Sequence, residues 1–288
     1  MPTALFRGYD AWSMLEKPAY YIAFVTVVTL LLLGWSRIVR RIVDQSMGPA
    51  RQNAAYALLE AGRVVGIFSV SAAVVTDCVH GESAKSDIMW VAIFGLTSVV
   101  LLEATAKLGV YFLMRGNLPK QITEGNAAAG LAGGAQYAAT GIIMSQCMTG
   151  DSLSAFGISF AFFVIAKVTL HLLLAAFRFV TRYDDGEEII GENVAAAVSY
   201  AGATIALALI IGHAVSGDFQ GWPMSLRGYA ISIVFALGLL PVRKVVVEGL
   251  FMGRAGLDAA VAQERNVGIA GLEAAAYVGT AFLLNAIR

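Results

Sequence analysis

Six charged residues lie inside stretches of sequence that are otherwise strongly apolar. Because a charge at the centre of a membrane helix costs roughly 2.5 to 3.5 kcal/mol or more, such residues mark ion or proton pathways by default. We hypothesise that they form a buried charged network; the alternative is a structural set of compensating ion pairs. The six residues are Glu60, Arg63, Glu103, Lys107, Lys167 and Glu273.

Two of these carboxylates occupy the same place in related segments. Glu60 and Glu273 each follow an Asn by seven residues, which places them about 10 Å into a helix at 1.5 Å per residue. Burial favours the protonated form of a carboxyl group, as proton carriage requires. Arg63 is one helical turn from Glu60 and can pair with it. Either acid could equally be a neutral or paired group that holds helices together.

The Asn residues belong to a segment that is written four times: QNAAYALLEAG, GNAAAGLAGGA, ENVAAAVSYAG and RNVGIAGLEAA. Their Asn residues are Asn53, Asn126, Asn193 and Asn266. Each Asn can cap the backbone N–H groups at the start of a helix. The other interpretation is a cytoplasmic ring of Asn side chains at an ion entrance.

A polar stripe follows the Asn on one face of three of these helices. At about 100° per residue, positions 7, 11 and 14 after each Asn lie near the Asn direction. Beside Glu273, this stripe contains Tyr137, Thr140, Tyr200, Thr204, Tyr277 and Thr280. It is the face along which a small ion could cross.

The composition excludes a soluble protein and a nucleic-acid-binding protein. Of the 288 residues 58% are hydrophobic and 14% are charged, and the mean hydropathy is +0.72. Twenty Lys and Arg residues balance twenty Asp and Glu residues, so no cationic surplus is available for phosphates. No recognised catalytic motif, metal site or cofactor motif is present, and we expect a protein that is not an enzyme.

Eight stretches are long and apolar enough to cross about 30 Å of hydrocarbon as helices. They predict an all-α, polytopic membrane protein with an N-terminal segment 1–19 and four-helix domains 20–150 and 151–288. No cleavable signal peptide is recognised at the start. The predicted spans are 20–40, 53–76, 88–114, 126–148, 154–179, 193–215, 228–250 and 266–287.

The Asn-bearing segments open the even-numbered spans, so the chain is predicted to be four parallel two-helix repeats. Positions 2, 9 and 13 after each Asn hold only Ala or Gly, and so do positions 4 and 8. Two such stripes let neighbouring backbones approach closely in lipid. We expect the even spans to form a tight inner layer and the bulkier odd spans to face lipid.

The distribution of Lys and Arg predicts the orientation. The connections at the Asn side carry twelve of the twenty Lys and Arg residues and the opposite side carries five. The positive-inside rule then places both termini in the periplasm and the Asn residues in the cytoplasm. Cys78 and Cys147 fall at the outer ends of their spans and could form one disulfide.

The Asn-Ala/Gly signature, the acidic approach YDDGEEIIGEN and the ending ERNVGIAGLEAAAYVGTAFLLNAIR resemble the YjfL family of bacterial membrane proteins (UPF0719, domain of unknown function 350). The resemblance covers nearly the whole chain from about residue 20, as two tandem copies. It implies a bacterial inner-membrane location and supplies no catalytic residues.

Two functions remain open. The first is a gated or proton-coupled channel or transporter for H+ or a small monovalent cation. The second is a non-catalytic scaffold or envelope-stress sensor that recruits a cytoplasmic protein through its loops, such as the acidic segment 184–192. Homo-oligomerisation is compatible with either function.

Overall fold

The computed structural model describes residues 11–43, 53–80, 83–114, 118–178, 181–236, 247, 249 and 256–286. Throughout these ranges the regular structure is helical, as the composition predicts. The elements are α1 (Ala11–Val43), α2 (Ala54–Cys78), α3 (Ala84–Met114), α4 (Leu118–Glu124), α5 (Ala127–Cys147), α6 (Leu153–Arg178), α7 (Asp185–Ile190), α8 (Val194–Val215), α9 (Trp222–Ala236), η3 (Ala259–Gln263) and α11 (Val267–Ala286).

Six of these helices are long and apolar enough to cross a membrane: α1, α2, α3, α6, α8 and α11. The protein is therefore a polytopic helical membrane protein with six candidate spans. The two further predicted spans fall on α5, which is rich in Ala and Gly, and on 228–250. Of the latter range the structure describes the end of α9 and residues 247 and 249.

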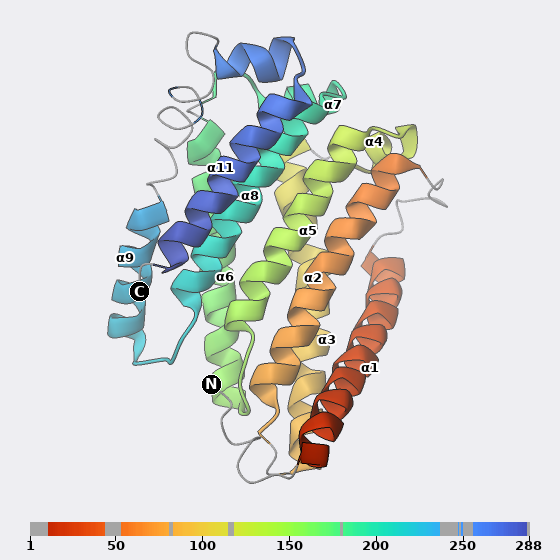
Figure 1. The fold of residues 1–288 in the computed structure, drawn as a ribbon, viewed down its shortest axis with the longest axis vertical. Coiled ribbons are helices and arrows are strands. Elements are labelled where there is room, and N and C mark those ends of the chain that lie inside the picture. Colours follow the sequence, from red (N-terminus) through yellow and green to blue (C-terminus); the bar gives the residue numbers. More distant parts are fainter. Residues whose placement is uncertain are drawn as a thin grey trace.

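Four long helices, α2, α5, α8 and α11, lie side by side in the order of the chain (Figure 1). All four begin at the same end of the molecule, where the short helices α4 and α7 also lie. We call these four the inner helices. Helices α3, α6 and α9 pack against this row, and α1 packs against α2 and α3.

Small residues bring the inner helices together. A Cβ atom added at Gly62 of α2 would overlap the backbone of Gly134 in α5, and one added at Gly130 would overlap Ala55. The same holds between α8 and α11, where a Cβ at Gly202 would overlap Ala274. Without glycine at these positions the backbones could not approach this closely.

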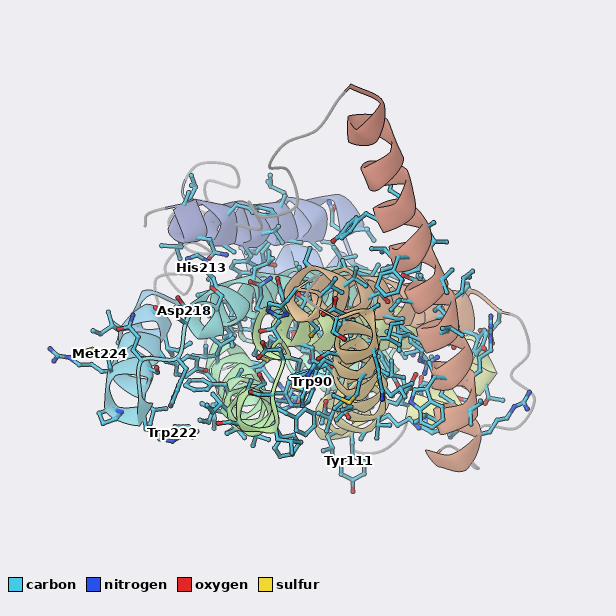
Figure 2. The ribbon with its side chains drawn as sticks, turned by 90° about the horizontal axis from the view of Figure 1, so that it is seen from below. Trp90, Tyr111, His213, Asp218, Trp222 and Met224 are labelled. Atoms are coloured by element: carbon cyan, nitrogen blue, oxygen red, sulfur yellow. The ribbon has the colours of Figure 1, made fainter. Side chains whose placement is uncertain are left out.

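The outer helices turn large side chains away from the bundle. Figure 2 looks along the molecule from below and shows Tyr111 of α3 and Trp222 and Met224 of α9 pointing outward. These three side chains are 45 to 59% exposed. An apolar exterior of this kind suits contact with lipid.

Candidate functional site

Each repeated Asn caps its helix. The Oδ1 atoms of the four residues accept a hydrogen bond from the backbone N–H three positions later. The donors are Tyr56, Ala129, Ala196 and Ile269, at 2.8, 3.1, 3.2 and 3.1 Å from Asn53, Asn126, Asn193 and Asn266.

The side-chain amides of three of these Asn residues also join one inner helix to the segment before the next. Asn53 Nδ2 donates to the Ile122 carbonyl at 2.7 Å, and Asn126 Nδ2 donates to the Ile189 carbonyl at 2.8 Å. Asn193 Nδ2 continues the series by donating to the Val261 carbonyl at 2.9 Å. These Asn side chains therefore clamp the inner helices together at one end.

A left-handed residue precedes three of the Asn residues, which the sequence patterns did not reveal. Gly125, Glu192 and Arg265 have φ of 89°, 62° and 52°. Each ends a short helical segment and turns the chain into the next inner helix, as left-handed residues commonly do. Because two of the three are not Gly, composition gave no signal for this turn.

A cluster of charges is buried between α1, α2, α3 and α5. Arg63 forms ion pairs with Glu60 on its own helix and with Glu103 Oε1 of α3, the latter at 3.0 Å. Arg40 Nη1 of α1 forms a further ion pair with Glu60 Oε1, at 2.5 Å. Arg63 is 3% and Glu103 0% exposed. Two arginines thus compensate two carboxylates.

Neutral groups complete this charge cluster. Tyr137 of α5 donates to Glu103 Oε2 at 3.2 Å and accepts from Arg63 Nη2 at 3.1 Å. The Arg63 guanidinium also lies 4.5 Å from the centroid of the Tyr137 ring, a distance suited to a cation–π contact. Ser36 of α1 donates to Glu103 Oε1 at 2.6 Å.

The structure brings together three of the six residues of the hypothesised network, Glu60, Arg63 and Glu103. Their partners Ser36 and Arg40 were missed, because Arg40 stands at the end of a predicted span among other loop arginines. Lys107 lies one turn beyond Glu103 on α3 and is half-buried.

Glu273 lies instead between α8 and α11. It is fully buried, and it accepts hydrogen bonds from Ser199 Oγ at 2.6 Å and from Tyr277 OH at 2.8 Å. The ring of Phe177 from α6 packs edge-on against Tyr277, with the ring centroids 5.5 Å apart. Two hydroxyl groups, one from each helix, therefore hold this carboxyl group between α8 and α11.

Lys167 of α6 lies in the middle of the molecule. It is 6% exposed, and its Nζ donates to Thr140 Oγ1 of α5 at 2.6 Å. Next to it, Gln136 Nε2 donates to Tyr200 OH of α8 at 2.6 Å. In the part of the chain that the structure describes, no ion pair is recorded for Lys167.

Every neighbouring pair of inner helices is thus joined by a buried polar contact. The contacts are Arg63–Tyr137, Gln136–Tyr200 and Ser199–Glu273. All six residues follow their Asn by six to eleven positions, roughly 9 to 17 Å along the helix. The threonines of the polar stripe differ: Thr140, Thr204 and Thr280 donate to carbonyls of their own helices.

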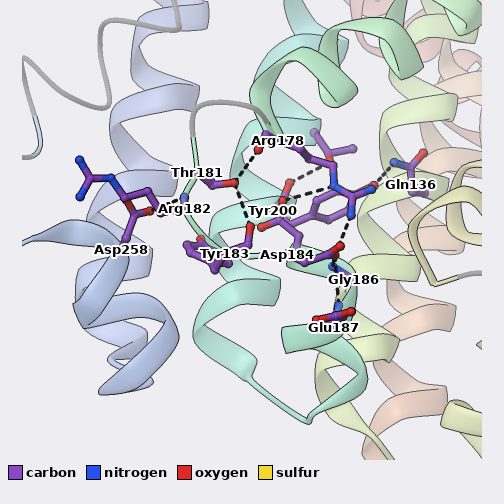
Figure 3. A network of polar contacts seen from close by, with 12 residues as sticks. Gln136, Arg178, Thr181, Arg182, Tyr183, Asp184, Gly186, Glu187, Tyr200 and Asp258 are labelled. Carbon is purple, nitrogen blue, oxygen red and sulfur yellow. Dashed lines mark hydrogen bonds and ion pairs between the residues drawn. The ribbon is translucent and has the colours of Figure 1, made fainter.

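Tyr200 also lies beside the connection between α6 and α8 (Figure 3). There Arg178 Nη2 donates to Asp184 Oδ1 at 2.7 Å, and the same oxygen caps α7. Partial burial opposes ionisation of Asp184, but backbone N–H groups and Arg178 outweigh it and lower the pKa of this carboxyl. A cavity of about 20 Å³ lies between Arg178, Asp185, Ser199, Tyr200 and Tyr277 among others.

The opposite end of the molecule holds a larger cavity of about 760 Å³ between α5, α6, α8 and α9. Its lining includes Gln146, Ser159, Phe162, Asp218 and Tyr229. On α6 the deepest of these is Phe162, five residues before Lys167. Roughly 7.5 Å of helix therefore separates the cavity from the buried lysine.

Cys78 and Cys147 are free, buried thiols in the structure, in place of the predicted disulfide. Cys147 Sγ donates to the Ile143 carbonyl of its own helix at 3.2 Å, so its side chain is held along α5. Among the described residues no group of three His, Cys, Asp or Glu side chains could hold a metal ion.

The sequence matches one known family. The profile of the family described as Domain of Unknown Function (DUF350) matches twice, at residues 11–148 and 151–287. A "UPF0719 transmembrane protein" of Aquifex aeolicus (strain VF5) is 24% identical over 197 residues, which cover 66% of this chain and 73% of that protein. No solved structure matches.

Proposed function

This multi-pass membrane protein belongs to the DUF350 family, whose two tandem matches cover nearly the whole chain. From its buried polar groups we propose a transport role. The proposed function is a gated or proton-coupled pathway for H+ or a small monovalent cation. The pathway follows the polar face of the inner helices where α5 and α8 meet α6.

The observation that carries this proposal is Lys167. Its ammonium group is buried near the middle of a candidate span, with the hydroxyl of Thr140 as its hydrogen-bond partner. The Arg63 cluster, by contrast, contains two positive and two negative side chains. Among the described residues no carboxylate pairs with Lys167. An unpaired charge in the membrane is costly and marks an ion or proton pathway.

Polar groups extend from Lys167 toward the Asn end of the molecule. The Thr140 hydroxyl donates to the Gln136 carbonyl at 2.6 Å, and the Gln136 side chain donates to Tyr200. Tyr200 lines the small cavity next to Arg178 and Asp185. These hydroxyl and amide groups therefore mark the side of α5 and α8 along which we propose that the proton travels. The hydrogen bonds do not themselves form an unbroken relay, because Thr140 donates to a backbone carbonyl.

On the other side, the 760 Å³ cavity extends as far as Phe162. The remaining helical length between Phe162 and Lys167 is apolar, because it contains Phe163, Val164, Ile165 and Ala166. This barrier is the proposed gate. A wide, permanently open pore does not fit, since small residues draw the inner helices into direct contact.

The architecture we propose for this function has eight spans in four parallel two-helix units. In it, α5 and the segment 228–250 join the six candidate spans. Both termini are periplasmic, and the Asn residues face the cytoplasm of a bacterial inner membrane. The excess of Lys and Arg on the Asn side supports this orientation.

The scaffold or stress-sensor function remains the alternative, but its proposed docking segment has structural duties. Asp184 caps α7, Asp185 is buried, and Glu188 accepts a hydrogen bond from Asn193. Glu187 and Glu192 are the exposed acids of that segment. We also propose that the protein works without catalysis.

The test is proton flux into liposomes that contain the purified protein, followed with an internal pH-sensitive dye. We expect Lys167→Met to reduce the flux at least about tenfold, equivalent to about 1.4 kcal/mol in the barrier. A Glu60→Gln, Glu273→Gln double variant reports separately whether the two membrane carboxylates belong to the pathway.

Lys120→Gln is the matched control, because Lys120 is 68% exposed on α4. It should conduct like the parent protein. A folded parent protein that passes none of H+, Na+ and K+ under a gradient would overturn the transport proposal. Undiminished flux in folded Lys167→Met would exclude the lysine from the pathway.

A further inference from the structure

The first and last pairs of inner helices pack in the same way. In the α2–α5 contact, positions 2, 9 and 13 of the first helix, which are Ala55, Gly62 and Gly66, meet glycines of the second. In the α8–α11 contact, position 9 of α8, Gly202, meets position 8 of α11, Ala274. In both contacts the earlier helix uses the face with positions 2, 9 and 13, and the later helix uses the face with positions 4 and 8.

The last helix of the row offers its forward face to nothing in the described structure. Positions 2, 9 and 13 of α11 are Gly268, Ala275 and Gly279, and all three are exposed. A Cβ atom added at Gly279 would have no heavy atom within 4 Å. The equivalent residue of α2, Gly66, meets the backbone of α5.

The first helix has the complementary face exposed. Positions 4 and 8 of α2 are Ala57 and Ala61, and both are exposed. Farther along the same side, Phe68 is 53% exposed. In α5 the equivalents of the two alanines are Gly130 and Gly134, which are buried against α2.

The hydrogen bonds that join the Asn side chains to the next inner helix also end at α11. The side-chain amides of Asn53, Asn126 and Asn193 each donate to the segment before the next inner helix. Asn266 caps α11 in the same way but is exposed. Its Nδ2 has no hydrogen-bond partner recorded within the described ranges.

We propose that a second copy of this chain completes the row, with α11 of one copy docked head to tail against α2 of the other. The occupant is a second copy because faces equivalent to these two already pair with each other inside the chain, in the α2–α5 and α8–α11 contacts. In a dimer both open faces are covered when the two head-to-tail contacts close into a ring. Small-residue faces associate by close backbone packing in lipid. The proposal does not depend on ion transport.

Disulfide crosslinking tests this contact. In a chain with Cys78 and Cys147 replaced by alanine, Ala61→Cys and Ala275→Cys are introduced into separate, differently tagged copies. Ala275 is position 9 of α11 and Ala61 is position 8 of α2. These positions correspond to those that meet in the internal contacts Gly62–Gly134 and Gly202–Ala274. We expect a crosslinked dimer carrying both tags when the two variants are coexpressed and oxidised, and at least about a tenfold weaker band from either variant alone, following the distance limits of a disulfide.

A cysteine at Leu172 provides the matched control, because this residue is 65% exposed on α6, away from both faces. It should not crosslink to Ala61→Cys. Ala275→Phe, which adds bulk to an exposed position, should lower the dimer fraction measured by native mass spectrometry without loss of folded protein.

Two results would overturn the proposal. If both cysteines in one chain form a disulfide within that chain and no dimer appears, then α11 closes onto α2 of the same chain. If no crosslink forms and native mass spectrometry finds monomers alone, the two faces contact lipid.

Discussion

The side chain of Arg63 holds the buried charge cluster together. It contacts Glu60, Glu103 and Tyr137 at once, from three different helices, and it is almost fully buried. Removing one member of a buried ion pair is far more damaging than never having the pair, because the remaining charge stays in a medium that cannot solvate it. Arg63 is therefore the residue whose loss the cluster tolerates least.

We expect Arg63→Met to destabilise the folded protein by about 3 to 5 kcal/mol, since it leaves Glu103 without its closest counter-ion. The measurement is thermal unfolding of the detergent-solubilised protein. Adding Glu103→Gln should recover much of the lost stability. Arg37→Met, at an exposed position of α1, is the control and should change little. Equal melting temperatures for Arg63→Met and the control would show that the ion pairs contribute nothing.

At the scale of elements, the contact between α2 and α5 depends on the absence of side chains. Gly62 and Gly134 touch through their backbones, and Gly141 does the same with Gly66. A larger side chain introduced here would meet backbone atoms, because no flexible side chain lies in between that could move aside. The two helices would have to move apart and thereby loosen the contacts between Arg63 and Tyr137.

Gly62→Ala should destabilise the protein by about 1 to 3 kcal/mol through this overlap, although alanine is the better helix former. Gly157→Ala in α6 is its counterpart, because a Cβ there meets nothing within 4 Å. This control should be neutral or slightly stabilising. Both can be compared by urea unfolding monitored by fluorescence. A Gly62→Ala protein as stable as Gly157→Ala would contradict the close packing described here.

The all-helical membrane fold and six of the eight predicted spans follow from the sequence, because hydropathy is a local property. So does the pairing of Arg63 with Glu60, which lie one turn apart. The partners of Glu273 and Lys167 were not predictable, since these depend on which helix faces which across the row. Ser199 reaches Glu273 from α8, and Thr140 reaches Lys167 from α5. The spacing of residues within one segment of the chain does not identify such contacts.

At the scale of the whole molecule, the connections divide into two sets at opposite ends of the bundle. The segments with α4 and α7 lie at the Asn end, whereas the loop from Ser216 to Gly221 lies at the other. In the proposed orientation the first set is cytoplasmic and the second is periplasmic.

We expect a cysteine at Asp218 to react with a membrane-impermeant maleimide in intact cells, and a cysteine at Glu124 to react only after the membrane is opened. Both positions are exposed, and the native Cys78 and Cys147 are buried, so background labelling should be low. The ratio of labelling before and after permeabilisation is the measurement. The reverse pattern would invert the proposed topology and the direction of the proton pathway.

The composition of α5 also affects how the protein is made. Alanine and glycine let α5 lie directly against both α2 and α8, and for the same reason α5 is not among the six helices apolar enough to count as a span on its own. A nascent segment enters lipid from the translocon according to its hydrophobicity, and Ala and Gly contribute little to that partitioning. In the eight-span arrangement, α5 must therefore enter the bilayer together with α2 and α3, which are synthesised before it. In that arrangement we expect membrane insertion and helix assembly to be a single event for this part of the chain.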